Sequence, residues 1–289
     1  MTALAACEEP VELPDVPEQL LVESQLVAGE APQVRLRVVD ALGVPSTDPS
    51  LPYTEASLID EAGNVHLLYV AQASDSLVYL RNDDLIVTPG ERYSLRLRSP
   101  SFQLVQSTTQ VPQPTALTYP GSDTSEAEDT LPLDENVLNV SLSFTDADPE
   151  ANFYHVLVHE LEEGSEGGVL NAQIGSLEFL FVGLNAEGHR PEIGGLLFSD
   201  EDFEEQNLDA TLSIMAQVLS EQGAGRLAIE LRTVSPDYYA FHRQLAELEG
   251  SRPSGPRGGR FNTSTGNVEG GIGFFGAYSS AFFTIGYAR

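Results

Sequence analysis

A single thiol lies close to the start of the sequence, at Cys7. It follows Leu4-Ala5-Ala6, and small residues before a cysteine are typical of a bacterial lipobox, because signal cleavage needs small side chains before the cut. One cysteine also excludes an internal disulfide. We therefore expect that Cys7 carries a lipid anchor, and that residues 1–17 comprise this lipobox and a polar, proline-rich tether. The alternative is an unmodified cysteine.

Two histidines spaced by four residues, His155 and His159, could bind one metal ion if they shared a face of a helix. The residues around them are aromatic and β-branched, which favours a strand. Along a strand, four residues span about 13 Å, which is too far for two histidines to coordinate one zinc ion. We therefore expect a strand without a metal site, in which Tyr154, Val156 and Val158 face the core and both histidines face outward.

Three acidic residues, Asp146, Asp148 and Glu150, have the alternate spacing with which a calcium loop begins. The EF-hand pattern requires glycine at the sixth position and glutamate at the twelfth, where this chain has Ala151 and Leu157. A turn capped by aspartate side chains explains the spacing better. A looser calcium site in this loop between strands is the alternative, with the three acidic residues as its ligands.

A G-x-G-x-x-G pattern is formed by Gly271, Gly273 and Gly276. In a dinucleotide-binding fold this pattern opens a helix that leads to a second strand and an acidic ribose contact. Only residues 277–289 follow it here, which is too short a segment for those parts. We therefore expect that the glycines permit close packing of the backbone or a bulge at the edge of a sheet.

The chain carries a net charge of −30, and its 14 basic residues are all arginine. Such an acidic surface repels phosphate backbones, which argues against a nucleic-acid partner, and it also fits adaptation to high salt, where repulsion is screened. Arg252, Arg257 and Arg260 form the only basic patch that the sequence indicates. We predict that they contact a carboxylate-bearing partner or a polysaccharide, because arginine binds carboxylates through two hydrogen bonds. The alternative is a solvated loop.

Strands are the main elements that position these residues. Apolar and polar residues alternate with period two, which is typical of antiparallel sheets in sandwiches. Turn sequences lie between the alternating runs, at 61–64 and 88–90. The alternating runs cover residues 34–38, 93–97, 138–144, 210–214, 227–231 and 281–285.

The predicted fold class is all-β, with two β-sandwich-like domains. A stiff segment, residues 111–115, contains two prolines and divides a first domain at 18–113 from a second domain at 114–289. The acidic residues 122–135 are expected to form a mobile loop. No apolar run is long enough for a transmembrane helix.

One helix is expected near residues 235–250, within the second domain. Ser235 provides an N-cap and Pro236 the first helical position. The aromatic and leucine residues that follow have helical spacing, and Gly250 ends the helix.

Short motifs, in order along the chain, resemble those of the family called domain of unknown function 4249, found in Bacteroidota-type outer-membrane lipoproteins. The resemblance rests on Ala56 to Asp60 with Gly63, Val87 to Gly90 with Tyr93 and Leu95, Phe144 to Asp146 before Asn152 to Tyr154, Phe198 to Asp200 with Phe203, Leu231 to Tyr239, and Asn267 to Gly276. The family implies a lipid anchor, an immunoglobulin-like or transthyretin-like first domain, a second β domain and association with TonB-dependent outer-membrane transporters. It supplies no catalytic residues.

We therefore expect a non-enzymatic lipoprotein of the outer membrane or cell surface, without a cofactor, that acts as an accessory or binding subunit beside such a transporter. One alternative is a structural subunit or adhesin of an extracellular assembly, built by pairing of exposed strand edges. Another is a metal-dependent surface hydrolase that would use the acidic loops.

Overall fold

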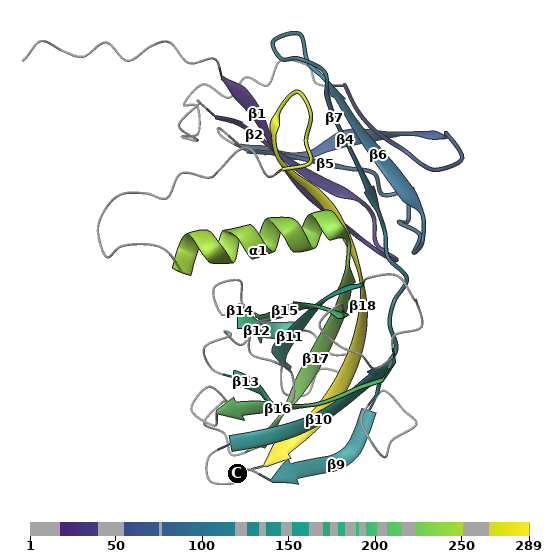
Figure 1. Ribbon diagram of the computed structural model, residues 1–289. Helices are drawn as coiled ribbons and strands as arrows, with labels where there is room; N and C mark the ends of the chain where they lie inside the picture. The colour runs from purple at the N-terminus through teal and green to yellow at the C-terminus, as the bar shows by residue number, and fades with distance from the viewer. Residues whose placement is uncertain are drawn as a thin grey trace, which may run out of the picture.

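The computed structural model confirms the all-β fold: the part of the chain that it describes consists of strands and a single helix (Figure 1). The strands form a 14-stranded sheet, which bends through several layers, and a separate four-stranded sheet. The structure describes residues 18–39, 55–74, 77–118, 126–132, 137–145, 152–161, 170–173, 179–182, 189–190, 195–200, 207–215, 224–250 and 266–288.

The amino-terminal sandwich packs two layers of strands around one apolar core. One layer contains β1, β2 and β5, the other contains β3, β6 and β7, and the long strand β4 pairs with both β5 and β3. Inward residues of both layers are fully buried, including Leu36, Leu58 and Leu95. The strand bounds are β1 Gln19–Val27, β2 Gln33–Val39, β3 Glu55–Ile59, β4 Val65–Ser74, β5 Leu77–Arg81, β6 Arg92–Arg98 and β7 Val105–Gln110.

The second sandwich packs the remainder of the large sheet, ordered β14-β15-β11-β17-β18, against the four-stranded sheet β13-β16-β10-β8. Phe144, Tyr154 and Phe198 are in ring contact within the core between the two sheets. The strands are β8 Leu117–Thr118, β9 Glu126–Pro132, β10 Val137–Thr145, β11 Phe153–Leu161, β12 Leu170–Gln173, β13 Phe179–Val182, β14 His189–Arg190, β15 Gly195–Ser199, β16 Asn207–Met215, β17 Ala224–Val234 and β18 Ile272–Ala288.

The last strand, β18, runs through both sandwiches (Figure 1). Its first half pairs in parallel with β1, and its whole second half pairs with β17. Phe275 and Ala277 therefore belong to the amino-terminal core, whereas Phe283 and Ile285 belong to the second core. The predicted division at residue 113 stays a prediction, but one strand from beyond it completes the first sandwich.

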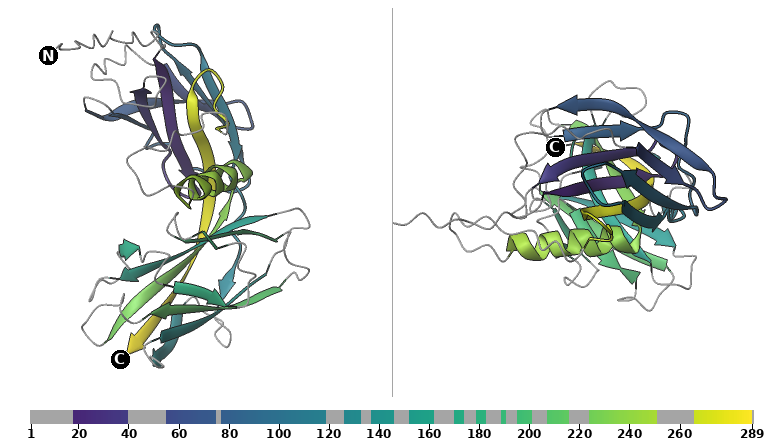
Figure 2. Two further views of the ribbon diagram at one scale, coloured as in Figure 1. Left: turned by 60° about the vertical axis from the view of Figure 1, so that its left-hand side comes forward. Right: turned by 90° about the horizontal axis from the view of Figure 1, so that it is seen from above.

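Helix α1, Pro236–Gly250, lies at the junction between the two sandwiches (Figure 2). The predicted N-cap is confirmed, because the hydroxyl of Ser235 accepts a hydrogen bond from the amide of Tyr238 at 3.3 Å. The same hydroxyl accepts the amide of Ala277 at 3.1 Å, which ties the start of the helix to β18. Within the described residues, no helix is long and apolar enough to span a membrane.

The six alternating runs that the sequence indicated all lie in strands, which confirms the period-two pattern. The prediction of a loop over 122–135 is wrong for residues 126–132, which form β9 and pair in parallel with β18. This pairing joins segments more than 150 residues apart, so no local pattern indicates it.

The glycine pattern near residue 273 is explained by close packing of two backbones. Gly273 has a φ of 109°, and a Cβ atom there would overlap the carbonyl of Val22 on β1. A Cβ atom on Gly271 would lie 2.7 Å from the carbonyl oxygen of Leu20. The expectation of tight backbone packing is confirmed, although β18 lies in the interior of the sheet and not at its edge.

Candidate functional site

Strand β6 presents a row of three arginines to solvent. Tyr93, Leu95 and Leu97 are buried, so the alternation of the strand directs Arg92, Arg96 and Arg98 outward, and all three are exposed (the burial pattern is the same as that expected from the sequence). Consecutive outward residues on a strand lie about 7 Å apart. The row therefore concentrates positive charge on one face of a chain whose net charge is −30.

Strand β4 places apolar side chains on the same face. The register sets Ser57 of β3 between Leu67 of β4 and Arg96 of β6, so these three side chains point the same way. Leu67 is 43% exposed, and its outward neighbours Val65 and Tyr69 are 61% and 63% exposed. Large apolar groups of this kind, gathered on one face, mark interaction surfaces.

We call this surface the arginine face, and define it by Arg92, Arg96, Arg98, Val65, Leu67 and Tyr69. None of the three arginines forms an ion pair with another residue in the part of the chain that the structure describes. An arginine with an open guanidinium can bind a carboxylate through two parallel hydrogen bonds. Arginine and tyrosine are also enriched where proteins bind each other.

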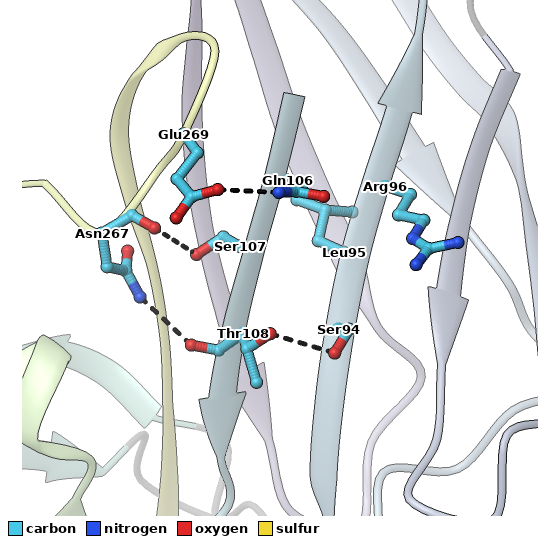
Figure 3. A pocket seen from close by; sticks show the side chains of 8 residues that line it. All are labelled: Ser94, Leu95, Arg96, Gln106, Ser107, Thr108, Asn267 and Glu269. Atoms are coloured by element: carbon cyan, nitrogen blue, oxygen red, sulfur yellow. Dashed lines mark hydrogen bonds between the residues drawn. The ribbon is translucent and has the colours of Figure 1, made fainter. Parts of the chain in front are cut away.

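A hollow of about 290 Å³ lies beside Arg96, where the segment 266–270 runs alongside β7 (Figure 3). Gln106 donates to the carboxylate of Glu269 at 2.7 Å, and Ser107 donates to the carbonyl of Asn267 at 2.8 Å. Backbone hydrogen bonds between Gln106 and Glu269 close the outer edge of β7. These contacts fix the segment against β7 and occupy the edge of the strand at Gln106.

Asn267 fixes the loop to which this segment belongs. Its side-chain amide donates to the carbonyl of Phe275 at 2.7 Å, and its side-chain oxygen accepts the amide of Phe275 at 2.9 Å. The loop in between turns through Gly270, whose φ is 74°. The two hydrogen bonds between Asn267 and Phe275 therefore hold the two ends of this loop together.

A second polar cluster is buried on the outer side of the β11-β17-β18 sheet. Glu230 is 3% exposed, and its carboxylate accepts hydrogen bonds from Arg232 and Ser280. His159 Nε2 lies 2.9 Å from the same carboxylate and must donate to it, because an ionised carboxylate can only accept. Burial opposes the charge on Glu230, but the hydrogen bonds from His159 and Arg232 outweigh it and lower its pKa to about 2.

The same cluster reaches helix α1. Tyr238 Oη lies 2.8 Å from His155 Nδ1 and accepts a hydrogen bond from Arg232 at 3.4 Å. The guanidinium of Arg232 also lies 4.3 Å from the centre of the Tyr278 ring. Burial lowers the pKa of His155 well below its usual value, and the charge of Arg232 adds to this effect. The cluster joins the helix to the second sandwich.

The prediction for His155 and His159 is partly wrong. Tyr154, Val156 and Val158 face the core as expected, and the histidines lie on the opposite face of β11. However, they are only 2% and 6% exposed, because that face of the sheet is itself covered. Alternation along a strand fixes which residues share a face, but not whether that face meets solvent.

The other candidate residues from the sequence lie outside the described residues. These are the anchor Cys7, the basic loop residues Arg252, Arg257 and Arg260, and the calcium candidates Asp146, Asp148 and Glu150. The statement that the loop holds the only basic patch is wrong, because β6 carries three exposed arginines. The sequence already contained that signal, as arginines at alternate positions of a predicted strand. Within the described ranges, no group of three or more histidine, cysteine or acidic residues could hold a metal ion.

Comparison with known proteins gives one family match and several distant structures. The family model described as "Domain of unknown function (DUF4249)" matches residues 8–282. No curated protein sequence matches the chain.

Three solved structures are similar to parts of the chain. A DUF4785 family protein from Legionella pneumophila has 8% identity and a TM-score of 0.26, over 75% of this chain and 52% of its own. Trypsin-activated alpha-2-macroglobulin from Escherichia coli has 12% identity and a TM-score of 0.26, over 77% and 15%. DIP-gamma IG1+IG2 has 10% identity and a TM-score of 0.23, over 95% and 99%. The chain thus spans about half of the first of these proteins.

Proposed function

Because this chain belongs to the family of domain of unknown function 4249, to which 8–282 are matched, we propose that it is a non-enzymatic binding subunit, anchored to the outer membrane and exposed at the cell surface. Its partner is a protein, a TonB-dependent transporter of the same membrane. The observation that carries the proposal is the arginine face, where three exposed arginines lie beside three exposed apolar side chains.

The composition of the arginine face favours a protein partner. Tyrosine and leucine supply contact area that is removed from water, while arginine supplies directional pairing with carboxylates. Charge repulsion from the rest of the acidic chain disfavours polyanions at long range. A protein with a local acidic patch and an apolar centre satisfies both requirements.

The anchor in this proposal is Cys7, which carries fatty-acyl chains such as palmitate after removal of a signal segment. Two or more acyl chains give stable membrane attachment, whereas one chain binds only marginally. Residues 8–17 would then separate the amino-terminal sandwich from the bilayer. Such a tether leaves the arginine face able to reach a neighbouring membrane protein.

The test combines membrane isolation with a variant of the arginine face. The full-length protein is purified after chemical cross-linking in its native membrane, and its partners are identified by mass spectrometry. We expect a TonB-dependent barrel protein, whose yield falls at least tenfold in the double variant Leu67→Asp, Arg96→Glu. The control is Arg226→Glu, which makes the same charge change as Arg96→Glu at an exposed site of β17. An undiminished yield in the double variant, or no barrel protein with the wild type, contradicts the proposal.

Attachment is tested separately with Cys7→Ser. We expect this variant in the aqueous phase and the wild type in the membrane, with an acyl mass on the amino-terminal peptide. A bare thiol at Cys7 in membrane-associated wild-type protein contradicts the lipid anchor. It does not affect the cross-linking test of the arginine face, which is read separately.

A further inference from the structure

A trough crosses the outer face of the other layer of the amino-terminal sandwich. Two hollows, of about 330 and 430 Å³, share Gln25, Val27 and Gln33 in their walls and therefore adjoin each other. We call them together the β1–β2 trough. Sites for small ligands typically have volumes of about 300–1,000 Å³, and the trough falls within that range.

Helix α1 forms one end of the trough. The ring of Phe241 stacks on Phe274 of β18, with a centroid distance of 4.3 Å and an angle of 5° between the rings. Glycine at position 276 leaves room for the Phe274 ring, because a Cβ atom there would strike it. Gln25 on the floor lies 3.4 Å from His242 of the helix.

Charged residues extend from this end across the floor. The register places Glu23 beside Phe274, Arg35 beside Glu23, and Tyr79 beside Arg35. Three strand steps of about 4.8 Å make this row roughly 14 Å long. The Arg35 guanidinium lies 5.5 Å from the centre of the Tyr79 ring, and its buried Nε has no hydrogen-bond partner among the described residues.

The far end of the trough is polar and exposed. Arg81 pairs with Asp83 there, beside Glu30 and the apolar Ile86. Along its whole length the trough has three acidic residues and two arginines, so charge nearly cancels. Gln25 and Gln33 can each donate and accept hydrogen bonds.

These properties exclude several classes of ligand. An extended peptide binds to a sheet by adding a strand, but β1 and β2 are each paired on both sides and have no open edge. A polyanion would meet three carboxylates, and an acyl chain would leave the glutamines and charged groups unpaired. An uncharged ligand with many hydroxyl groups fits, because each hydroxyl both donates and accepts.

We propose that the β1–β2 trough binds an uncharged oligosaccharide. The carbon-bound hydrogens of a sugar ring would pack on the face of Phe241 that is turned away from Phe274, while its hydroxyls would bind Gln25, Gln33 and the terminal guanidinium nitrogens of Arg35. The site is separate from the arginine face, which lies on the other layer of the sandwich. Binding of an oligosaccharide in the trough is therefore independent of binding of a transporter to the arginine face.

The experiment titrates the full chain with four neutral hexasaccharides, namely maltohexaose, cellohexaose, mannohexaose and xylohexaose, by isothermal calorimetry. We expect at least one to bind with a Kd below about 1 mM, equivalent to roughly 4 kcal/mol. Gln33→Ala should weaken that binding at least tenfold, and Phe241→Leu about fivefold, because the flat ring face is lost. Gln33 is exposed, so this variant keeps the fold, which circular dichroism verifies.

The matched control is Gln110→Ala, an exposed glutamine on β7 in the other layer. It should leave binding unchanged, as should Arg96→Glu. The proposal is overturned if none of the four sugars binds, or if Gln33→Ala binds as the wild type does. Preferential binding of hexagalacturonate would also overturn it, since that result would define an anionic ligand.

Discussion

The guanidinium of Arg232 donates two hydrogen bonds to the carboxylate of Glu230, from Nε at 2.7 Å and from Nη2 at 3.0 Å. The two residues lie two positions apart on β17 and therefore share a face of the sheet. Because Tyr238 of α1 and Ser280 of β18 bind the same pair, this contact joins three elements at the junction of the sandwiches.

Loss of one partner of this pair should destabilise the fold strongly. Arg232→Met leaves the buried carboxylate of Glu230 without its cation, and we expect a loss of about 3–5 kcal/mol in the free energy of unfolding. Urea denaturation measures it. The double variant Arg232→Met, Glu230→Leu should lose less, since neither charge remains. A double variant that is as unstable as the single one contradicts this account.

A partly exposed ion pair provides the matched control. Arg37 Nε lies 3.8 Å from Glu23, and both side chains are about one third exposed. Arg37→Met should therefore cost less than about 1 kcal/mol.

Acid should weaken the fold already between pH 7 and pH 5. Burial lowers the pKa of His242 from 6.5 to about 4, so the folded protein keeps this ring neutral while the unfolded chain gains a proton below pH 6.5. The contribution of His242 to the free energy of unfolding is therefore complete above pH 6.5 and is lost as the pH falls toward 4. Glu230 adds a loss in the same direction between pH 4.5 and about 2. We expect a decline of roughly 1–2 kcal/mol between pH 7 and pH 5 from His242. Burial also lowers the pKa of His155, so this residue adds to the decline in the same direction.

The variant His242→Gln isolates this contribution. Urea unfolding at pH 8, 7, 6 and 5 should give a shallower slope for the variant than for the wild type. Comparison of the two proteins cancels the effect of acid on the overall charge. Equal slopes would show that His242 is not responsible.

Glycine at position 273 should be essential to the pairing of β18 with β1. Gly273→Ala adds a Cβ atom that would overlap the carbonyl of Val22, at a φ of 109°. We expect a loss of more than about 2 kcal/mol. Gly29→Ala is the control, because Gly29 has a φ of 80° with open space around it, and it should lose only about 1 kcal/mol. A thermal melt compares the two variants. If both lose the same stability, the positive φ alone accounts for the cost and the overlap with Val22 does not.

Salt should stabilise the protein, as adaptation to high salt predicts. The net charge is −30, and the screening length falls from about 10 Å at 0.1 M salt to about 3 Å at 1 M. We expect about 1 kcal/mol of added stability, or roughly 2–4 °C in melting temperature. Sodium chloride is preferred over sulfate, which strengthens apolar burial by itself. An unchanged melting temperature would exclude this role for the charge.

The sequence by itself determined the local structure. Alternation fixed which residues of β6 and β11 share a face, since successive side chains of a strand point to opposite sides. Ser235 and Pro236 fixed the start of the helix, because a hydroxyl cap and a residue without an amide hydrogen suit that position. The order of the short motifs along the chain also indicated the family, and the match over residues 8–282 confirms it.

Only the tertiary structure decided which faces are covered and which segments meet. His155 and His159 lie on the predicted face of β11, but contacts with Tyr238 and Glu230, more than 70 residues away, remove them from water. The pairing of β18 with β1 depends on the approach of Gly273 to Val22, which no local pattern contains. Burial and strand pairing depend on contacts between residues that are far apart in sequence, so only the assembled fold determines them.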